Sequence, residues 1–166
     1  LKVYQQTILN PIVLSGIGLH SGEKVNLRIL PGNDDQGLVF KRVDLKKNNF
    51  IFANFNNVNS TKLCTSIQNI HDVKVSTVEH LLAAFYIADI DNAVIEIENQ
   101  EMPIMNGSSK IFTEPIKKSK LKFIAIMASD LETNPNELMR MIKISIKNPN
   151  SIISADRWLS QRGFSN

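Results

Sequence analysis

Strict alternation between residues 24 and 30 is the feature that most constrains the fold of this chain. The apolar residues Val25, Leu27 and Ile29 alternate with the polar residues Lys24, Asn26 and Arg28. A period of two residues is typical of a β-strand that buries one face and exposes the other. Pro31-Gly32-Asn33-Asp34 directly after the run predicts a turn. The chain is therefore expected to contain a sheet that packs one face on a core.

Other segments extend this β structure over residues 3–70. A second strand is predicted around Leu38 and Phe40, and the asparagine-rich stretch 50–58 favours a strand only weakly. In the next candidate strand Leu63, Thr65 and Ile67 share one face. Alternation resumes over 93–98, so these segments together predict a sheet of several strands.

The first predicted helix covers residues 76–88. Ser76 followed three residues later by Glu79 is the pattern of a capping box, in which each side chain satisfies a backbone N–H at the helix start. Residues 89–92 predict its end. Its apolar stripe is typical of a core-facing helix and consists of Val78, Leu81, Leu82 and Phe85.

The loop 101–107 leads to a second helical stretch near Ser108. Pro115 is expected to break it after less than two turns, because proline lacks an N–H and clashes with the preceding turn. Beyond residue 119 the pattern predicts a strand over 122–127, a helix capped by Asn134 and a short helix over 154–162. The fold class predicted is α+β.

Composition limits the compartment and the partners. Cys64 is the one cysteine, which excludes an intrachain disulfide and favours a reducing compartment. No apolar run approaches the roughly 20 residues of a membrane span, and the start has no signal-peptide core. The net charge of +3 is small and no stacking aromatics accompany the lysines, which argues against nucleic-acid binding. We therefore expect a cytoplasmic protein without a transmembrane segment or a nucleic-acid partner.

Three patterns carry possible chemistry, although spacing alone favours a plain reading of each. Glu79-His80 combines a metal-binding imidazole with a carboxylate base, but such a dipeptide is more often a solvated helix end. The glycine-rich run 16–22 precedes a strand rather than a helix, which favours a tight β turn over a phosphate loop. Cys64 with His71 could form a nucleophile and its base, yet a single strand cysteine is usually a packing residue.

Seven segments of the sequence are similar to segments of one enzyme family and follow one another along the chain in the same order as in that family. The segment around the Glu-His pair is Asp72-Val73-Lys74-Val75-Ser76-Thr77-Val78-Glu79-His80-Leu81-Leu82. The others are Gln6-Thr7, Gly16-Ile17-Gly18-Leu19-His20-Ser21-Gly22, Phe40-Lys41-Arg42-Val43-Asp44, Leu63-Cys64-Thr65, Ile90-Asp91-Asn92-Ala93 and Pro103-Ile104-Met105-Asn106-Gly107-Ser108. They resemble the UDP-3-O-acyl-N-acetylglucosamine deacetylases, which are zinc-dependent enzymes of lipid A biosynthesis.

The resemblance implies roles for particular residues. His80 matches a zinc ligand and Glu79 matches the general base that acts on the attacking water. Leu63 and Cys64 match a stretch near the sugar of the UDP-sugar substrate. His20 matches a histidine of the first motif whose role stays unassigned. The implied fold is a β-α-α-β domain with two helices on one face of a sheet, packed in the family against a second, similar domain.

Departures from the family pattern imply an incomplete site. No histidine follows His80, so the His-Lys-x-x-Asp zinc motif and the histidine proton donor of the second domain are missing. Asn106 stands where the family has an aspartate, and keeps only a possible helix-capping role. We expect a deacetylase amino-terminal domain over residues 1–119 and an unassigned tail over 120–166, from a truncated, frameshifted or split gene. Without the second domain, the helix flank that bears Ala84 and Ile87 is expected to face solvent.

The sequence therefore predicts a part of a zinc amidohydrolase that is inactive alone and completed by a carboxy-terminal domain in trans. A non-catalytic relic or binding module that keeps the fold is the alternative. An unrelated α+β binding domain would require the ordered matches to be accidental.

Overall fold

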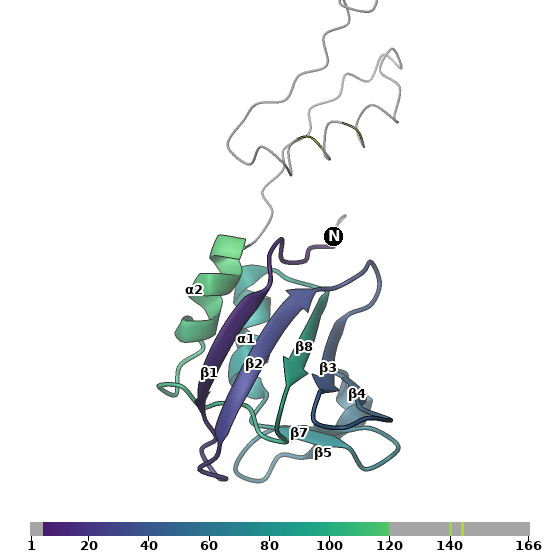
Figure 1. Ribbon diagram of the computed structural model, residues 1–166, viewed down its shortest axis with the longest axis vertical. Helices are drawn as coiled ribbons and strands as arrows, with labels where there is room; N and C mark the ends of the chain where they lie inside the picture. The colour runs from purple at the N-terminus through teal and green to yellow at the C-terminus, as the bar shows by residue number, and fades with distance from the viewer. Residues whose placement is uncertain (1–4, 120–139, 141–143, 145–166) are drawn as a thin grey trace, which may run out of the picture. The chain divides into compact units, whose positions relative to one another are not determined.

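The computed structural model describes residues 5–119, together with residues 140 and 144 (Figure 1). The contacts within the chain divide it into two units, residues 1–121 and residues 122–166. The strand predicted over 122–127 and the helix predicted over 154–162 lie outside the described residues. Of the helix predicted after Asn134, Arg140 and Ile144 are described and are helical.

A five-stranded sheet forms the body of the first unit, in the order β1-β2-β8-β3-β4 (Figure 1). β8 pairs antiparallel with β2 and parallel with β3, and the other neighbouring pairs are antiparallel. The strands are β1 (Ile12–Ile17), β2 (Lys24–Pro31), β3 (Leu38–Arg42), β4 (Phe50–Phe52) and β8 (Ala93–Ile97). Three further strands, which precede the first helix in the chain, form a second sheet in the order β5-β6-β7. It contains β5 (Val58–Ser60), β6 (Ser66–Gln68) and β7 (Lys74–Ser76), preceded by the 3-10 helix η1 (Phe55–Asn57).

The alternation that predicted β2 is confirmed residue by residue. Val25, Leu27 and Ile29 are fully buried, and the residues between them are exposed. The strands predicted around Phe40 and over 93–98 are confirmed as β3 and β8. The weakly favoured strand 50–58 is instead divided among β4, η1 and the start of β5. The sheet thus presents one apolar face to the core.

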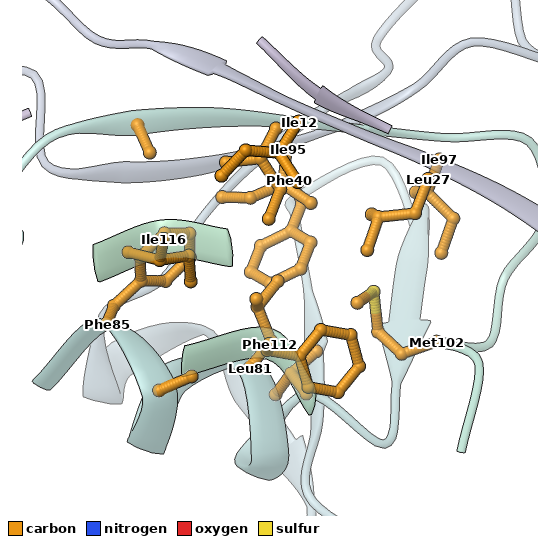
Figure 2. Packing of buried hydrophobic residues seen from close by; sticks show 14 of the residues in the cluster. Ile12, Leu27, Phe40, Leu81, Phe85, Ile95, Ile97, Met102, Phe112 and Ile116 are labelled. Carbon is orange, nitrogen blue, oxygen red and sulfur yellow. The ribbon is translucent and has the colours of Figure 1, made fainter. Parts of the chain in front are cut away.

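Two helices, α1 (Glu79–Ala88) and α2 (Lys110–Ser119), cover this apolar face. Figure 2 shows Leu81 and Phe85 of α1 and Phe112 of α2 pointing toward the strands, with the Phe40 ring between the layers. All four of these side chains are buried. The prediction of an α+β domain with both helices on one face of a sheet is confirmed, with the three-stranded sheet as an addition. Neither helix of residues 5–119 is long and apolar enough to cross a membrane.

The predicted capping box is wrong. Ser76 is the last residue of β7, where its N–H and its hydroxyl both donate to the backbone oxygen of Gln100, at 2.9 and 3.1 Å. α1 begins three residues later, and its N-cap residue, Val78, makes no side-chain capping bond. Strand pairing therefore engages the serine that local sequence would assign to the helix.

The prediction that Pro115 ends the second helix is also wrong. α2 is ten residues long in all, and it extends four residues beyond Pro115 to Ser119. Phe112 before the proline and Ile116 after it are both buried in the core. Full burial of one large apolar side chain contributes roughly 1.5–3 kcal/mol, which is comparable to the cost of about 3 kcal/mol for an interior proline. The burial of Phe112 and Ile116 in the core therefore stabilises the helix enough to offset the cost of Pro115.

The exposed helix flank predicted for α1 is confirmed at one residue and wrong at the other. Ile87 is 52% exposed, whereas Ala84 is fully buried. Ala84 belongs to the same core cluster as Phe112 and Ile116 of α2, so it is part of the core that the two helices share.

Candidate functional site

Glu79 and His80 are the first two residues of α1, and both side chains are partly buried. The Oε2 atom of Glu79 accepts the backbone N–H of Thr65 at 3.0 Å. His80 Nδ1 is buried, and it is the side-chain polar atom within residues 5–119 that is buried without a hydrogen-bond partner. A buried, unpaired imidazole nitrogen is unusual, because such groups normally find a donor or acceptor. The pair thus combines an oriented carboxylate with a free imidazole nitrogen.

An unusual backbone conformation precedes this pair. Thr77 has φ of +58°, in the left-handed region that β-branched residues rarely adopt. It turns the chain abruptly from β7 into α1, with only Val78 before the helix. The turn is what places Glu79 and His80 at the end of the sheet, next to the strands that precede them.

Leu63 and Cys64 lie just before β6 and are connected to Glu79 through the next residue, Thr65. The neighbouring Thr65 donates its N–H to Glu79, and its oxygen accepts the N–H of Val78 at 3.3 Å. Leu63 is 84% exposed and has φ of +67°, whereas Cys64 is half-buried. The strand predicted to include Leu63 and Thr65 therefore begins later, at Ser66. The structure places Leu63 and Cys64 in a loop fastened to the start of α1.

The predicted β turn in the run 16–22 is confirmed as the hairpin between β1 and β2. Gly22 donates its N–H to the oxygen of Gly18 at 3.0 Å, and Gly18 donates to Glu23 at 2.9 Å. His20 is exposed on this hairpin, and its backbone N–H donates to Glu101 Oε1 at 2.9 Å. Figure 1 shows the hairpin at the same end of the sheet as β7.

Glu101 is a buried residue that the sequence analysis did not single out. It is 3% exposed, and besides His20 it accepts the N–H of Ser21 on Oε2 at 2.8 Å and the Thr77 hydroxyl on Oε1 at 3.4 Å. Burial by itself would raise the pKa of Glu101, but the donors from His20 and Ser21 outweigh burial and lower that pKa below its ordinary value. A lone carboxylate in a loop gives no sequence signal, because its partners come from a hairpin and a turn distant along the chain.

Arg42 fastens β3 to the second sheet at the same end. Its guanidinium forms a two-pronged pair with Asp44, at 2.8 and 2.6 Å, and donates to the backbone oxygen of Lys74 in β7 at 3.0 Å. The hydrogen bonds from Arg42 lower the pKa of Asp44 below its ordinary value. The Phe40–Asp44 segment therefore has a structural part in holding the strand that leads to α1.

Asn106 does not cap α2. Its Oδ1 accepts the N–H of Ser108 at 3.2 Å, two residues before the helix begins, and so closes a turn. Met105 beside it has φ of +57°. Residues 103–104 lie against the β1–β2 hairpin, where Pro103 bridges Gly18 and Ile104 donates to Ile17 at 3.0 Å.

His71 and Cys64 are not brought together as a catalytic pair by any hydrogen bond described. His71 lies in the turn after β6, and Cys64 lies before that strand. The exposed His71 lines a surface groove of about 300 Å³ with Phe50, Phe52 and Ile70. These positions favour the packing reading of Cys64.

The described residues fit a zinc ion only in part. His80 Nδ1 is buried without a hydrogen-bond partner, and Glu79 is the adjacent residue. A catalytic zinc requires three protein ligands and an open position. Within residues 5–119, no group of three histidine, cysteine or acidic side chains is placed to hold one. Residues 5–119 therefore hold His80 and Glu79 side by side without a complete set of metal ligands.

Comparisons with known proteins give one consistent family match. The sequence pattern described as "LpxC: UDP-3-O-acyl N-acetylglycosamine deacetylase" matches residues 5–157, and so continues into the tail, where no family motif was recognised. The UDP-3-O-acyl-N-acetylglucosamine deacetylase of Brucella melitensis biotype 2 is 37% identical over 134 residues, 76% of this chain and 46% of the relative. That of Idiomarina loihiensis is 48% identical over 110 residues, 66% of this chain and 36% of the relative. The chain thus spans less than half of the length of these relatives.

Proposed function

Because the chain belongs to the UDP-3-O-acyl N-acetylglycosamine deacetylase family, we propose that it supplies one half of an active site that removes the N-acetyl group of UDP-3-O-acyl-N-acetylglucosamine, a reaction of lipid A biosynthesis. The complete site requires a second domain, joined to this one or bound in trans. The buried, unpaired Nδ1 of His80 beside the carboxylate of Glu79 is the observation that supports this proposal best.

In this mechanism His80 contributes one ligand of a Zn²⁺ ion, which when bound polarises the amide carbonyl and activates a water molecule. Glu79 removes the proton of the attacking water as general base. The hydrogen bond from Thr65 to Oε2 fixes the orientation of the carboxylate and leaves Oε1 for that proton. The C–N bond then breaks, releasing acetate and the amine, whose proton must come from a donor that the second domain supplies.

Neighbouring residues define where the sugar nucleotide would lie. Leu63 is exposed, and Cys64 is half-buried in the loop tied to α1, so both can contact a sugar beside Glu79. His20 is exposed on the hairpin that Glu101 connects to Thr77, and it can reach a group of the same substrate. Asn106 has no assigned role in this scheme, and its Oδ1 closes a turn by accepting the N–H of Ser108.

The decisive experiment complements the chain with the missing part. The purified chain is mixed with Zn²⁺ and the separately produced remainder of the Brucella melitensis relative, and acetate release from the sugar nucleotide is measured. We expect no turnover by either part alone and turnover by the mixture. Glu79→Gln should reduce the rate by roughly 10²–10⁴-fold, because an amide cannot act as a base.

His71→Ala is the matched control, because His71 is an exposed histidine outside the pair, and it should leave the rate unchanged. His80→Ala should abolish turnover. A mixture that associates but releases no acetate would support the alternative, a non-catalytic relic or binding module that keeps the fold.

A further inference from the structure

We propose that Glu101 is a positioning residue, which holds Thr77 in its left-handed conformation and thereby aims Glu79 and His80 at the site. The inference rests on the proposed function only in taking Glu79 and His80 as the functional pair. Glu101 itself lies outside that pair. Three segments distant along the chain meet at its carboxylate: the β1–β2 hairpin, the β7–α1 turn and the loop after β8.

The contacts of the carboxylate use both of its oxygen atoms. Oε1 accepts the N–H of His20 and the hydroxyl of Thr77, and Oε2 accepts the N–H of Ser21. Gly18 makes this approach possible, because a Cβ atom there would lie 2.6 Å from Oε2 and 2.3 Å from the Ser21 hydroxyl oxygen. The absence of a side chain at this position thus lets the hairpin close over a buried charge.

The backbone on both sides of Glu101 is fastened to the residue before Thr77. Ser76 donates its N–H to Gln100 at 2.9 Å, and its oxygen accepts the N–H of Met102 at 3.0 Å. Ser76 and Glu101 form a parallel bridge. The Thr77 hydroxyl is therefore held against Glu101 at a residue whose positive φ is unfavourable for a β-branched side chain.

From Thr77 the constraint passes directly to the functional pair. Val78 follows, held by Thr65, and the same Thr65 donates to Glu79. Relaxation of Thr77 to an extended conformation would turn the first residues of α1 away from Thr65. A strained residue at a functional site persists only where its surroundings determine it, and Glu101 is the buried group that does so here.

The test uses the full chain and nuclear magnetic resonance, without metal or substrate. In Glu101→Gln the amide NH₂ cannot accept one of the two backbone N–H groups, so the His20 or Ser21 amide proton should shift upfield. The φ-dependent coupling at position 77 should move toward extended values, and the ring signals of His80 should change. Glu98→Gln, at an exposed glutamate near the end of β8, is the control and should change none of these.

Rescue separates positioning from general stability. Glycine adopts a positive φ without strain, so Thr77→Gly combined with Glu101→Gln should return the His80 ring signals toward those of the unmodified chain, while the hairpin amide stays shifted. Should Glu101→Gln fail to fold, Thr77→Val removes the hydroxyl and keeps the shape, and it should change the coupling at position 77 and the His80 ring signals.

A folded Glu101→Gln chain with unchanged signals at position 77 and His80, a double variant without rescue, or an unaffected Thr77→Val chain would each overturn the proposal. None of these signals depends on turnover, so loss of the proposed activity and loss of the positioning role are separate results.

Discussion

The two ends of the five-stranded sheet differ in which residue types adopt a positive φ. At the end that holds Glu79, three residues with positive φ are large or β-branched: Leu63, Thr77 and Met105. At the opposite end the residues with positive φ are Asp35, Gly37 and Asp89, of the types that tolerate this conformation. Large or β-branched residues with positive φ thus occur at the end where the proposed functional pair lies.

Burial of charge follows the same division. The site end buries Glu101 and Arg42. At the opposite end the buried polar group is the uncharged Asn92, and the carboxylates of Asp89 and Asp91, which accept hydrogen bonds from Gln6, are exposed or half-buried. Both ends are well bonded, but only the site end depends on buried charged groups and unfavourable backbone. The end that holds Glu79 and His80 is therefore stabilised by a few specific contacts to buried charged groups.

The largest effect is expected from Glu101→Ala. The change leaves the N–H groups of His20 and Ser21 without their acceptor, and each buried unsatisfied group costs roughly 1–3 kcal/mol. The free energy of unfolding should fall by about 2–4 kcal/mol, measured by urea denaturation. A loss below about 1 kcal/mol would show that water replaces the carboxylate and that this end is less dependent on it.

Asn92→Ala is the matching change at the opposite end and should cost less. Asn92 is buried, accepts the N–H of Gly37 on Oδ1 and donates to Gln5, both at 2.7 Å. Its loss leaves one backbone N–H unpaired, so we expect a loss of about 1–2 kcal/mol in the same urea assay. A loss larger than that of Glu101→Ala would reverse the comparison.

Leu63→Gly is expected to stabilise the chain. The left-handed conformation costs a leucine about 1–2 kcal/mol, and glycine removes this cost. Glycine also loses more backbone entropy on folding, which offsets roughly 0.5–1 kcal/mol of the gain. Since the side chain is 84% exposed, little packing is lost. The free energy of unfolding should rise by about 0.5–1 kcal/mol. Leu63→Ala, which keeps the strain, is the control and should bring no gain.

The smallest expected effect is on acid stability. The folded-state pKa values of Glu101 and Asp44 lie below their ordinary values, so the unfolded chain binds these protons more readily than the folded chain. Their contribution to stability is present above the unfolded pKa values and is lost as the pH falls through the folded ones. Glu101→Gln should flatten the loss of stability below about pH 4.5 in denaturation series. An unchanged slope would mean that Glu101 does not titrate differently on folding.

Local pattern predicted the parts of this fold that depend on burial of a single face. The alternation of Val25, Leu27 and Ile29 required a strand, and the glycines of run 16–22 before a strand required a hairpin. Pattern also placed Glu79 and His80 together, and the ordered motifs identified the family. These features are encoded in residues that lie close together in the sequence.

The start of α1, the continuation of α2 through Pro115 and the hydrogen bonds of Glu101 depend on contacts between distant segments and were not predicted. Ser76 could act either as a helix cap or as a backbone partner of the distant segment 100–102, and in the folded chain it bonds to Gln100 and Met102. Glu101 obtains its three donors from residues about 80 and 24 positions away. Local sequence was enough to predict which faces are apolar and which side chains could carry chemistry, because both depend on residue type and spacing. The choice between competing hydrogen-bond partners required the folded chain, because it depends on which segments packing brings together.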